Sequence, residues 1–72
     1  MRFIRVGDSF INMDLVSRYY IIEESSNKIG IFADGDLLFE LGSRWEAERM
    51  MEKIIDFSAK GNGVFNPTED EE

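Results

Sequence analysis

The chain of 72 residues contains no cysteine and no histidine. Without cysteine it forms neither a disulfide nor a thiolate metal site, which are common supplements to a small core. Without histidine it lacks the commonest metal ligand and the commonest general base, so none of its serines has an imidazole to activate it. Its glycines occur at turns rather than in a phosphate-binding spacing. We therefore expect no metal, no cofactor and no enzymatic activity of the chain acting alone.

Long apolar runs are also lacking. The longest candidate, residues 19–22, falls far short of the roughly 20 residues that a membrane span needs. Residues 1–8 carry charges where a signal peptide would need its apolar stretch. These features predict a soluble, cytoplasmic protein that does not bind membranes.

Basic residues are scarce, with 8 Lys and Arg against 15 Asp and Glu, and the net charge is −7. Residues 61–72 contain four acidic residues and no basic one. Binding to nucleic acid through phosphates needs clustered Lys and Arg. The basic residues here are scattered among acidic ones, so we expect no direct contact with DNA or RNA.

What the chain does contain is typical of one small folded domain. Hydrophobic residues make up 43% and aromatic residues 12% of the sequence, both too high for a disordered chain. Residues 3–6 and 10–13 read as a hairpin around a turn at residues 7–9. A bend or single helical turn follows at residues 14–16, where Leu15 and Val16 are expected to close one end of the core.

Three further strands are predicted over residues 17–24, 28–33 and 36–41. The first of them is the strongest, because its tyrosines and isoleucines are good strand formers. The Asp34-Gly35 pair between the second and third is a strong hairpin signal, since a type I′ turn requires positive φ.

A capped helix is predicted over residues 44–60. Ser43 and Glu46 have the spacing of a capping box, and Gly61 follows at the expected C′ position. The apolar residues fall on one helical face, which comprises Ala47, Met50, Met51, Ile54 and Ile55. Because residues 61–63 form a breaker cluster, residues 1–61 are predicted to be the single domain and residues 62–72 a disordered acidic tail.

These elements predict an α+β fold, in which a small antiparallel sheet of four to five strands (hairpin, bend, hairpin) is packed by one C-terminal helix. The order of elements resembles that of many small bacterial and phage proteins, including short flagellar-accessory ones. The shared features, residues 11–16 and the Asp34-Gly35 turn, are generic, and the resemblance implies no particular function.

The supply of apolar side chains exceeds what one helix can cover. The strand at residues 17–24 is apolar on both faces, which favours cover on both sides. Such a sheet either curls into a barrel, leaves an apolar patch, or buries that patch against another chain. The candidate protein-binding residues are Tyr20, Ile22, Phe32, Leu38 and Trp45, and the expected partner is another protein or a second copy in a homodimer.

Two functions remain open from the sequence. The first is a non-enzymatic protein-binding module or regulatory accessory subunit. The alternative is an acidic inhibitor that imitates nucleic acid and blocks a nucleic-acid-binding protein or nuclease. The alternative would bind through Glu48, Glu52 and Asp56 on the helix and would lose affinity as salt rises.

Overall fold

The structure, a computed structural model, describes residues 1–67 of the chain. One helix and one short 3₁₀ turn accompany six strands in this part of the chain, in the order β1 (Arg2–Val6), β2 (Ser9–Asn12), η1 (Met13–Leu15), β3 (Tyr19–Ser25), β4 (Lys28–Ala33), β5 (Asp36–Leu41), α1 (Arg44–Lys60) and β6 (Gly63–Phe65). The predicted α+β class with a single C-terminal helix is confirmed.

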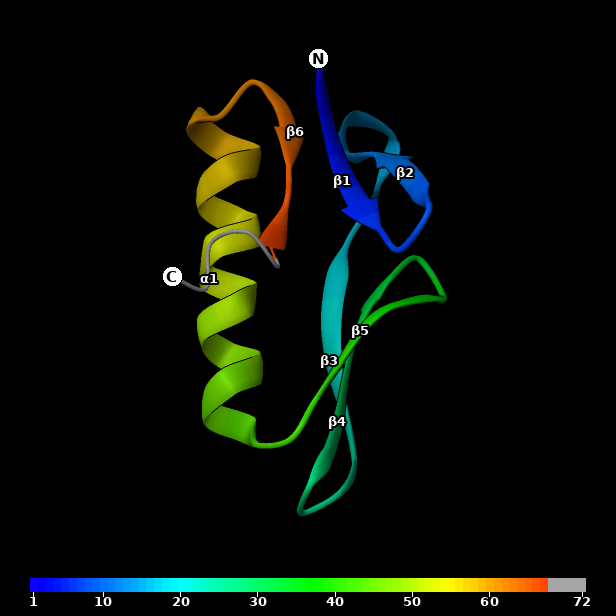
Figure 1. Ribbon diagram of the computed structural model, residues 1–72, viewed down its shortest axis with the longest axis vertical. Coiled ribbons are helices and arrows are strands. Elements are labelled where there is room, and N and C mark those ends of the chain that lie inside the picture. The colour runs from blue at the N-terminus through cyan, green and yellow to red at the C-terminus, as the bar shows by residue number, and fades with distance from the viewer. Residues whose placement is uncertain (68–72) are drawn as a thin grey trace.

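The first sheet has the strand order β2-β1-β6. β1 and β2 form the predicted antiparallel hairpin, which turns at Gly7 with a φ of 61°. β6 pairs in parallel with β1, from Arg2 opposite Gly63 to Ile4 opposite Phe65. Figure 1 shows the result, with β6 lying between α1 and β1.

The second sheet is an antiparallel meander with the order β3-β4-β5. Asp34 and Gly35 join β4 to β5 with φ values of 52° and 97°, the two positive angles that a type I′ turn requires. The Asp34 carboxylate accepts the backbone N–H groups of Ser17 and Arg18 at 2.8 and 3.1 Å. The turn is therefore fixed to the segment that leads into β3.

The prediction of one sheet of four to five antiparallel strands is wrong, because the strands divide into two three-stranded sheets. The η1 turn separates β2 from β3, and the hairpin and the meander do not pair with each other. The parallel strand β6 was not predicted. It has only three residues and begins at the second glycine of a Gly-Asn-Gly sequence, so it is too short to show the alternation that identifies a strand.

The core lies between the inner faces of the sheets and α1. Ile4, Ile29, Ile31 and Ile54 are completely buried, and one comes from each of β1 and α1 and two from β4. Having two sheets supplies more inner surface than a single sheet, so residues such as Val6, Ile11, Tyr19 and Ile21 also pack against this core. Part of the apolar surplus is thereby accommodated.

Two residues that were expected to face the core, Leu15 and Ile55, are exposed to solvent. Leu15 is 78% exposed, and Met13 of η1 is buried in its place while Val16 packs against the core. On α1, Ala47, Met50 and Ile54 are buried as predicted, whereas Ile55 is 56% exposed. The apolar stripe is therefore narrower than the sequence indicates.

Both ends of α1 are stabilised by local contacts. The Ser43 hydroxyl accepts the N–H of Glu46 at 3.2 Å, and the Glu46 carboxylate accepts the N–H of Gly42 at 3.2 Å. At the other end Gly61 has a φ of −81°, so it is not a left-handed cap. A Cβ atom at Gly61 would collide with carbons of the Phe57 ring, so this position has no room for a side chain.

The chain remains structured past residue 61, where the sequence predicts the end of the domain. Residues 63–65 form β6, and Phe65 is buried against the core with an exposed fraction of 6%. Pro67 is also buried. Residues 68–72 of the predicted acidic tail lie outside the described residues.

Candidate functional site

The second sheet has one face toward the core and one toward solvent. Tyr19 and Ile21 of β3 and Ile29 and Ile31 of β4 belong to the core, so the alternate residues of these strands point away from it. We call this second surface the outer face, which comprises Tyr20, Ile22, Gly30, Phe32, Leu37 and Glu40. Figure 1 shows the sheet close to edge-on, with α1 to its left.

An aromatic stack forms the centre of the outer face. The Tyr20 and Phe32 rings lie with their centroids 5.5 Å apart and their planes 7° from parallel. The guanidinium carbon of Arg18 lies 5.2 Å from the centroid of the Tyr20 ring, within cation–π range. Phe32 of β4, Tyr20 of β3 and Arg18, which precedes β3, therefore pack against one another in a row.

Gly30 allows the stack to lie flat on the sheet. A Cβ atom at this position would lie 2.9 Å from the Phe32 ring and 3.1 Å from the Leu37 side chain. Phe32 and Leu37 therefore cover the backbone of Gly30, which is buried although it is on the solvent side. A glycine covered by a neighbouring aromatic ring is a recognised arrangement in sheets.

The outer face exposes a continuous apolar surface. Ile22 and Leu37 are 42% and 51% exposed, while Tyr20 and Phe32 are half-buried because they cover each other. In an antiparallel sheet with one solvated face, these positions are usually polar. A contiguous apolar patch of this kind marks an interaction surface in many proteins.

Charged residues border the apolar centre at both ends. Arg18 lies at the end where β3 begins. At the opposite end the Lys28 ammonium lies 3.9 Å from Glu24 and 4.0 Å from Glu40. The charges of these four side chains cancel, so the outer face is close to neutral on a protein with a net charge of −7.

The structure brings three of the five predicted binding residues together. Tyr20, Ile22 and Phe32 lie side by side on the outer face. Leu38 does not, because the register shifts between Ile31 and Phe32 and the resulting bulge turns Leu38 into the core, where it is 5% exposed. Leu37 takes its place on the outer face.

Trp45 is exposed, but on a different surface. It is 64% exposed on α1, which packs on the inner side of the same sheet. The Arg49 guanidinium lies 4.9 Å from the centroid of its ring. Trp45 therefore does not extend the outer face.

The solvent side of α1 carries charges of both signs, and some of them form ion pairs. Arg44 contacts Glu48 and Glu23 at 3.1 Å, and Lys60 contacts Asp56 at 3.3 Å. The hydrogen bonds that the Arg44 guanidinium donates to Glu48 and to Glu23 raise its pKa above the usual value, so it stays charged. The helix contains four basic and four acidic residues, so it does not present a negatively charged stripe.

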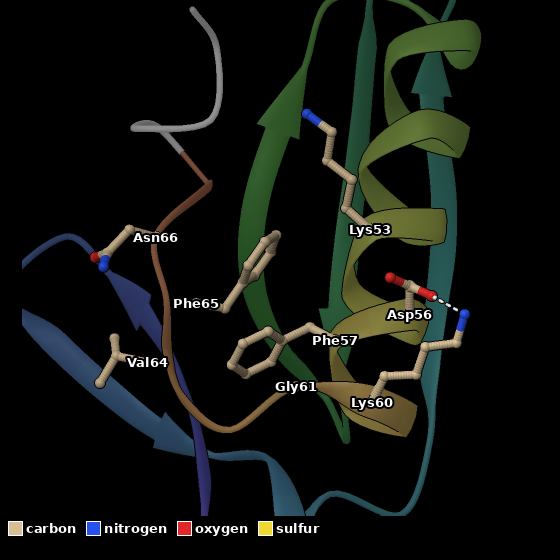
Figure 2. Close-up of a pocket in the computed structure, with 8 residues that line it drawn as sticks. All are labelled: Lys53, Asp56, Phe57, Lys60, Gly61, Val64, Phe65 and Asn66. Carbon is tan, nitrogen blue, oxygen red and sulfur yellow. Dashed lines mark ion pairs between the residues drawn. The ribbon is translucent and has the colours of Figure 1, made fainter.

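A depression of about 590 Å³ lies between the C-terminal half of α1 and β6. Figure 2 shows the Phe57 and Phe65 side chains on its floor, with ring centroids 5.4 Å apart, and the Lys60–Asp56 ion pair at its rim. The depression is wide and open to solvent. Within residues 1–67, no group of three or more acidic side chains is arranged to hold a metal ion.

Tyr19 carries a buried polar atom on the inner face of the second sheet. Its hydroxyl is shielded from solvent and has no hydrogen-bond partner among the described residues. Burial, followed by the nearby carboxylates of Asp34 and Asp14, raises the pKa of this hydroxyl above 10.0. Tyr19 therefore stays protonated and neutral at ordinary pH.

In the described part of the chain, no helix combines the length and apolar character needed to cross a membrane. Comparison of the chain with protein-family models, curated proteins and solved structures found no match. Function is therefore inferred from the geometry of the outer face.

Proposed function

We propose that the protein is a non-enzymatic protein-binding module that acts through the outer face of the β3-β4-β5 sheet. The observation that carries the proposal is the flat apolar surface formed by Tyr20, Phe32, Ile22 and Leu37 on the solvent side of a sheet. Burying such a surface against a partner is favourable by about 25 cal/mol per Å² of apolar area.

The outer face is also pre-organised for binding. The Arg18–Tyr20–Phe32 stack fixes three large side chains before a partner arrives. Ordering a flexible side chain at an interface costs about 0.5–1.5 kcal/mol, and this cost is reduced where the side chain is already held. Aromatic and arginine side chains are also enriched among the residues that dominate binding energy.

The alternative function, an acidic inhibitor that imitates nucleic acid, needs unpaired carboxylates on one surface. The net charge of −7 favours it. On α1, however, Glu48 and Asp56 form ion pairs with basic residues of the same helix. The geometry therefore supports a partner that binds the outer face better than a basic partner that binds α1.

Affinity capture with matched variants tests the proposal. The test variant carries Ile22→Glu and Leu37→Glu on the outer face. The control carries Leu15→Glu and Ile55→Glu, which add the same charge at apolar positions that are 78% and 56% exposed elsewhere. Circular dichroism and denaturation confirm that both remain folded.

The wild type and the control are expected to retain the same bound protein, and the outer-face variant to lose it. Apolar binding should also persist at about 1 M salt, where the Debye length is only about 3 Å. Retention of every bound protein by the outer-face variant would contradict the proposal. Loss of all binding at high salt would favour the acidic inhibitor instead.

A further inference from the structure

We infer that Asn62 is a site of spontaneous deamidation and that the opening of β6 controls the reaction. The inference does not involve the outer face and concerns the turn that joins α1 to β6. Three features of this region support it: the glycine that follows Asn62, the hydrogen bonds that hold the turn, and the small number of contacts that hold β6.

An asparagine that precedes glycine is able to react with its own backbone. The peptide nitrogen of the next residue loses its proton to base and attacks the side-chain amide carbon. A C–N bond forms and the bond to the side-chain nitrogen breaks, so that this nitrogen takes up a proton and leaves as ammonia. Water then opens the resulting succinimide ring at either carbonyl, which gives aspartate or isoaspartate. Glycine favours the attack because it has no side chain to crowd the nitrogen.

Asn62 differs from the other asparagines of the chain in its neighbour. It precedes Gly63, whereas Asn12, Asn27 and Asn66 precede methionine, lysine and proline. Methionine and lysine carry side chains beside the attacking nitrogen, and proline has no N–H group. Asn62 and Gly63 are both exposed, so base and water reach the reacting atoms. The chemistry therefore favours position 62 over the other three.

Two hydrogen bonds hold the reacting groups while the chain is folded. The Gly63 N–H donates to the Met1 carbonyl at 3.0 Å, and Oδ1 of Asn62 accepts the Met1 amino group at 3.2 Å. Figure 1 shows the N-terminus beside the start of β6, where both contacts lie. The Gly63 nitrogen has to give up its proton and approach the Asn62 amide, and both bonds oppose this movement. Pairing of β6 with β1 therefore protects Asn62.

Few contacts hold β6 in place. It has three residues, which pair only with the first three of β1. Within β6 only Phe65 is buried, and Val64 is 45% exposed. Short elements of this kind open at a lower free energy than the whole fold. Deamidation therefore proceeds from molecules in which β6 has separated from β1 while the rest of the protein stays folded.

The two products have opposite effects on β6. Aspartate at position 62 leaves the backbone unchanged, and its carboxylate is able to accept the same Met1 amino group. Isoaspartate takes the backbone through the side chain and lengthens it by one carbon, so the Gly63 N–H no longer meets the Met1 carbonyl. Isoaspartate therefore prevents β6 from pairing again, and Phe65 loses its place against Phe57.

Mass spectrometry of the full chain tests the inference. The protein is kept in mildly alkaline buffer, either folded or in urea, and is digested at intervals to locate the conversion of amide to acid. In urea, Asn62 is expected to react faster than every other asparagine. In the folded protein it should react about a hundredfold more slowly than in urea, because only the molecules with β6 open react.

Two matched variants separate the opening of β6 from global unfolding. Phe65→Leu weakens the packing of β6 and should speed the reaction of the folded protein about tenfold. Phe39→Leu makes the same change in β5, where Phe39 also packs against the core, and should leave the rate unchanged. Circular dichroism confirms that both variants are folded.

The product provides a second measurement. Protein that has formed isoaspartate at position 62 should be less stable than the wild type in urea denaturation. The variant Asn62→Asp, which has the charge of the product on an ordinary backbone, should retain wild-type stability. Equal stability of all three would overturn the proposed release of β6.

Three outcomes would overturn the inference about the reaction. In urea, a rate at Asn62 no higher than at Asn12 or Asn27 would show that position 62 is not a preferred site. Equal rates in the folded and unfolded protein would show that β6 does not protect it. Equal acceleration by Phe65→Leu and Phe39→Leu would show that global unfolding controls the reaction.

Discussion

At the scale of single residues, the close contact between Gly61 and Phe57 explains how the chain leaves α1. The Phe57 ring occupies the space that a side chain at position 61 would need. The Gly61 carbonyl accepts a hydrogen bond from Nε of Arg2 at 2.9 Å. Figure 2 shows the turn that begins here and leads into β6. Position 61 therefore requires glycine because a side chain would collide with Phe57. The backbone φ of −81° is one that other residues also adopt.

Gly61→Ala is expected to destabilise the protein by about 1–3 kcal/mol. The added methyl group forces the Phe57 ring away from Phe65, and overpacking of this kind commonly has that effect. Chemical denaturation would measure the change. Gly42→Ala serves as the control, because a Cβ atom there would meet its nearest neighbour at an ordinary 3.6 Å.

Tyr19→Phe is expected to stabilise the protein by about 1 kcal/mol. The substitution removes a buried hydroxyl that lacks a partner, and leaving such a group unpaired costs about 1–3 kcal/mol. Because the pKa of Tyr19 is raised by folding, the wild type should also lose stability as the pH rises above about 10. The unfolded chain releases this proton first, so the variant should lose less stability over that range.

Denaturation midpoints at pH 7 and at about pH 10.5 check both effects. A loss of more than about 1 kcal/mol at pH 7 would show that the hydroxyl makes a favourable hydrogen bond in solution.

Ile54 and Ile55 offer a matched pair on α1. Ile54 is completely buried and Ile55 is 56% exposed. Ile54→Ala should therefore cost about 2–5 kcal/mol, whereas Ile55→Ala should change stability by less than about 0.5 kcal/mol. Equal effects in urea denaturation would contradict the orientation of α1.

At the scale of secondary-structure elements, β6 contributes more than its length indicates. It pairs with β1, the Gly63 N–H donates to the Met1 carbonyl at 3.0 Å, and Phe65 stacks on Phe57. Truncation after Gly61 removes all three contacts and should cost at least about 3 kcal/mol, comparable to deletion of a buried phenylalanine.

Truncation after Pro67 is the control, because it preserves every described contact. Thermal denaturation of the two truncated chains should show near wild-type stability for the longer and a large loss for the shorter. An unchanged midpoint in the shorter chain would show that β6 is dispensable.

The elements that the sequence predicted best are those with strong local signals. Strand-forming tyrosines and isoleucines identified β3, the Asp34-Gly35 pair identified the turn before β5, and the Ser43–Glu46 spacing identified the start of α1. The division into two sheets could not be predicted, because it depends on contacts between residues as distant as Arg2 and Gly63. The sequence also could not show that Leu37, and not Leu38, lies on the outer face. A bulge reverses the side of the sheet to which the next side chains point, and it leaves no mark in the local sequence pattern.

At the scale of the whole molecule, the protein has one hydrophobic core and two chemically different surfaces. α1 carries charges of both signs toward solvent, whereas the outer face of the second sheet carries an aromatic stack with Arg18 at one end and Glu24 at the other. The sequence predicted this surface, because it has more apolar side chains than one helix can cover and Tyr20, Ile22 and Phe32 were among the candidates. Arg18 gave no signal, because its place beside Tyr20 becomes evident only once the rings are stacked.

The most direct test of binding through the outer face is to compare amide NMR spectra of the ¹⁵N-labelled protein alone and with the protein that affinity capture recovers. We predict shifts that are confined to β3, β4 and β5 and are largest near Tyr20, Ile22 and Phe32, while α1 is unchanged. Shifts centred on Trp45 and Arg49 of α1 would contradict binding through the outer face.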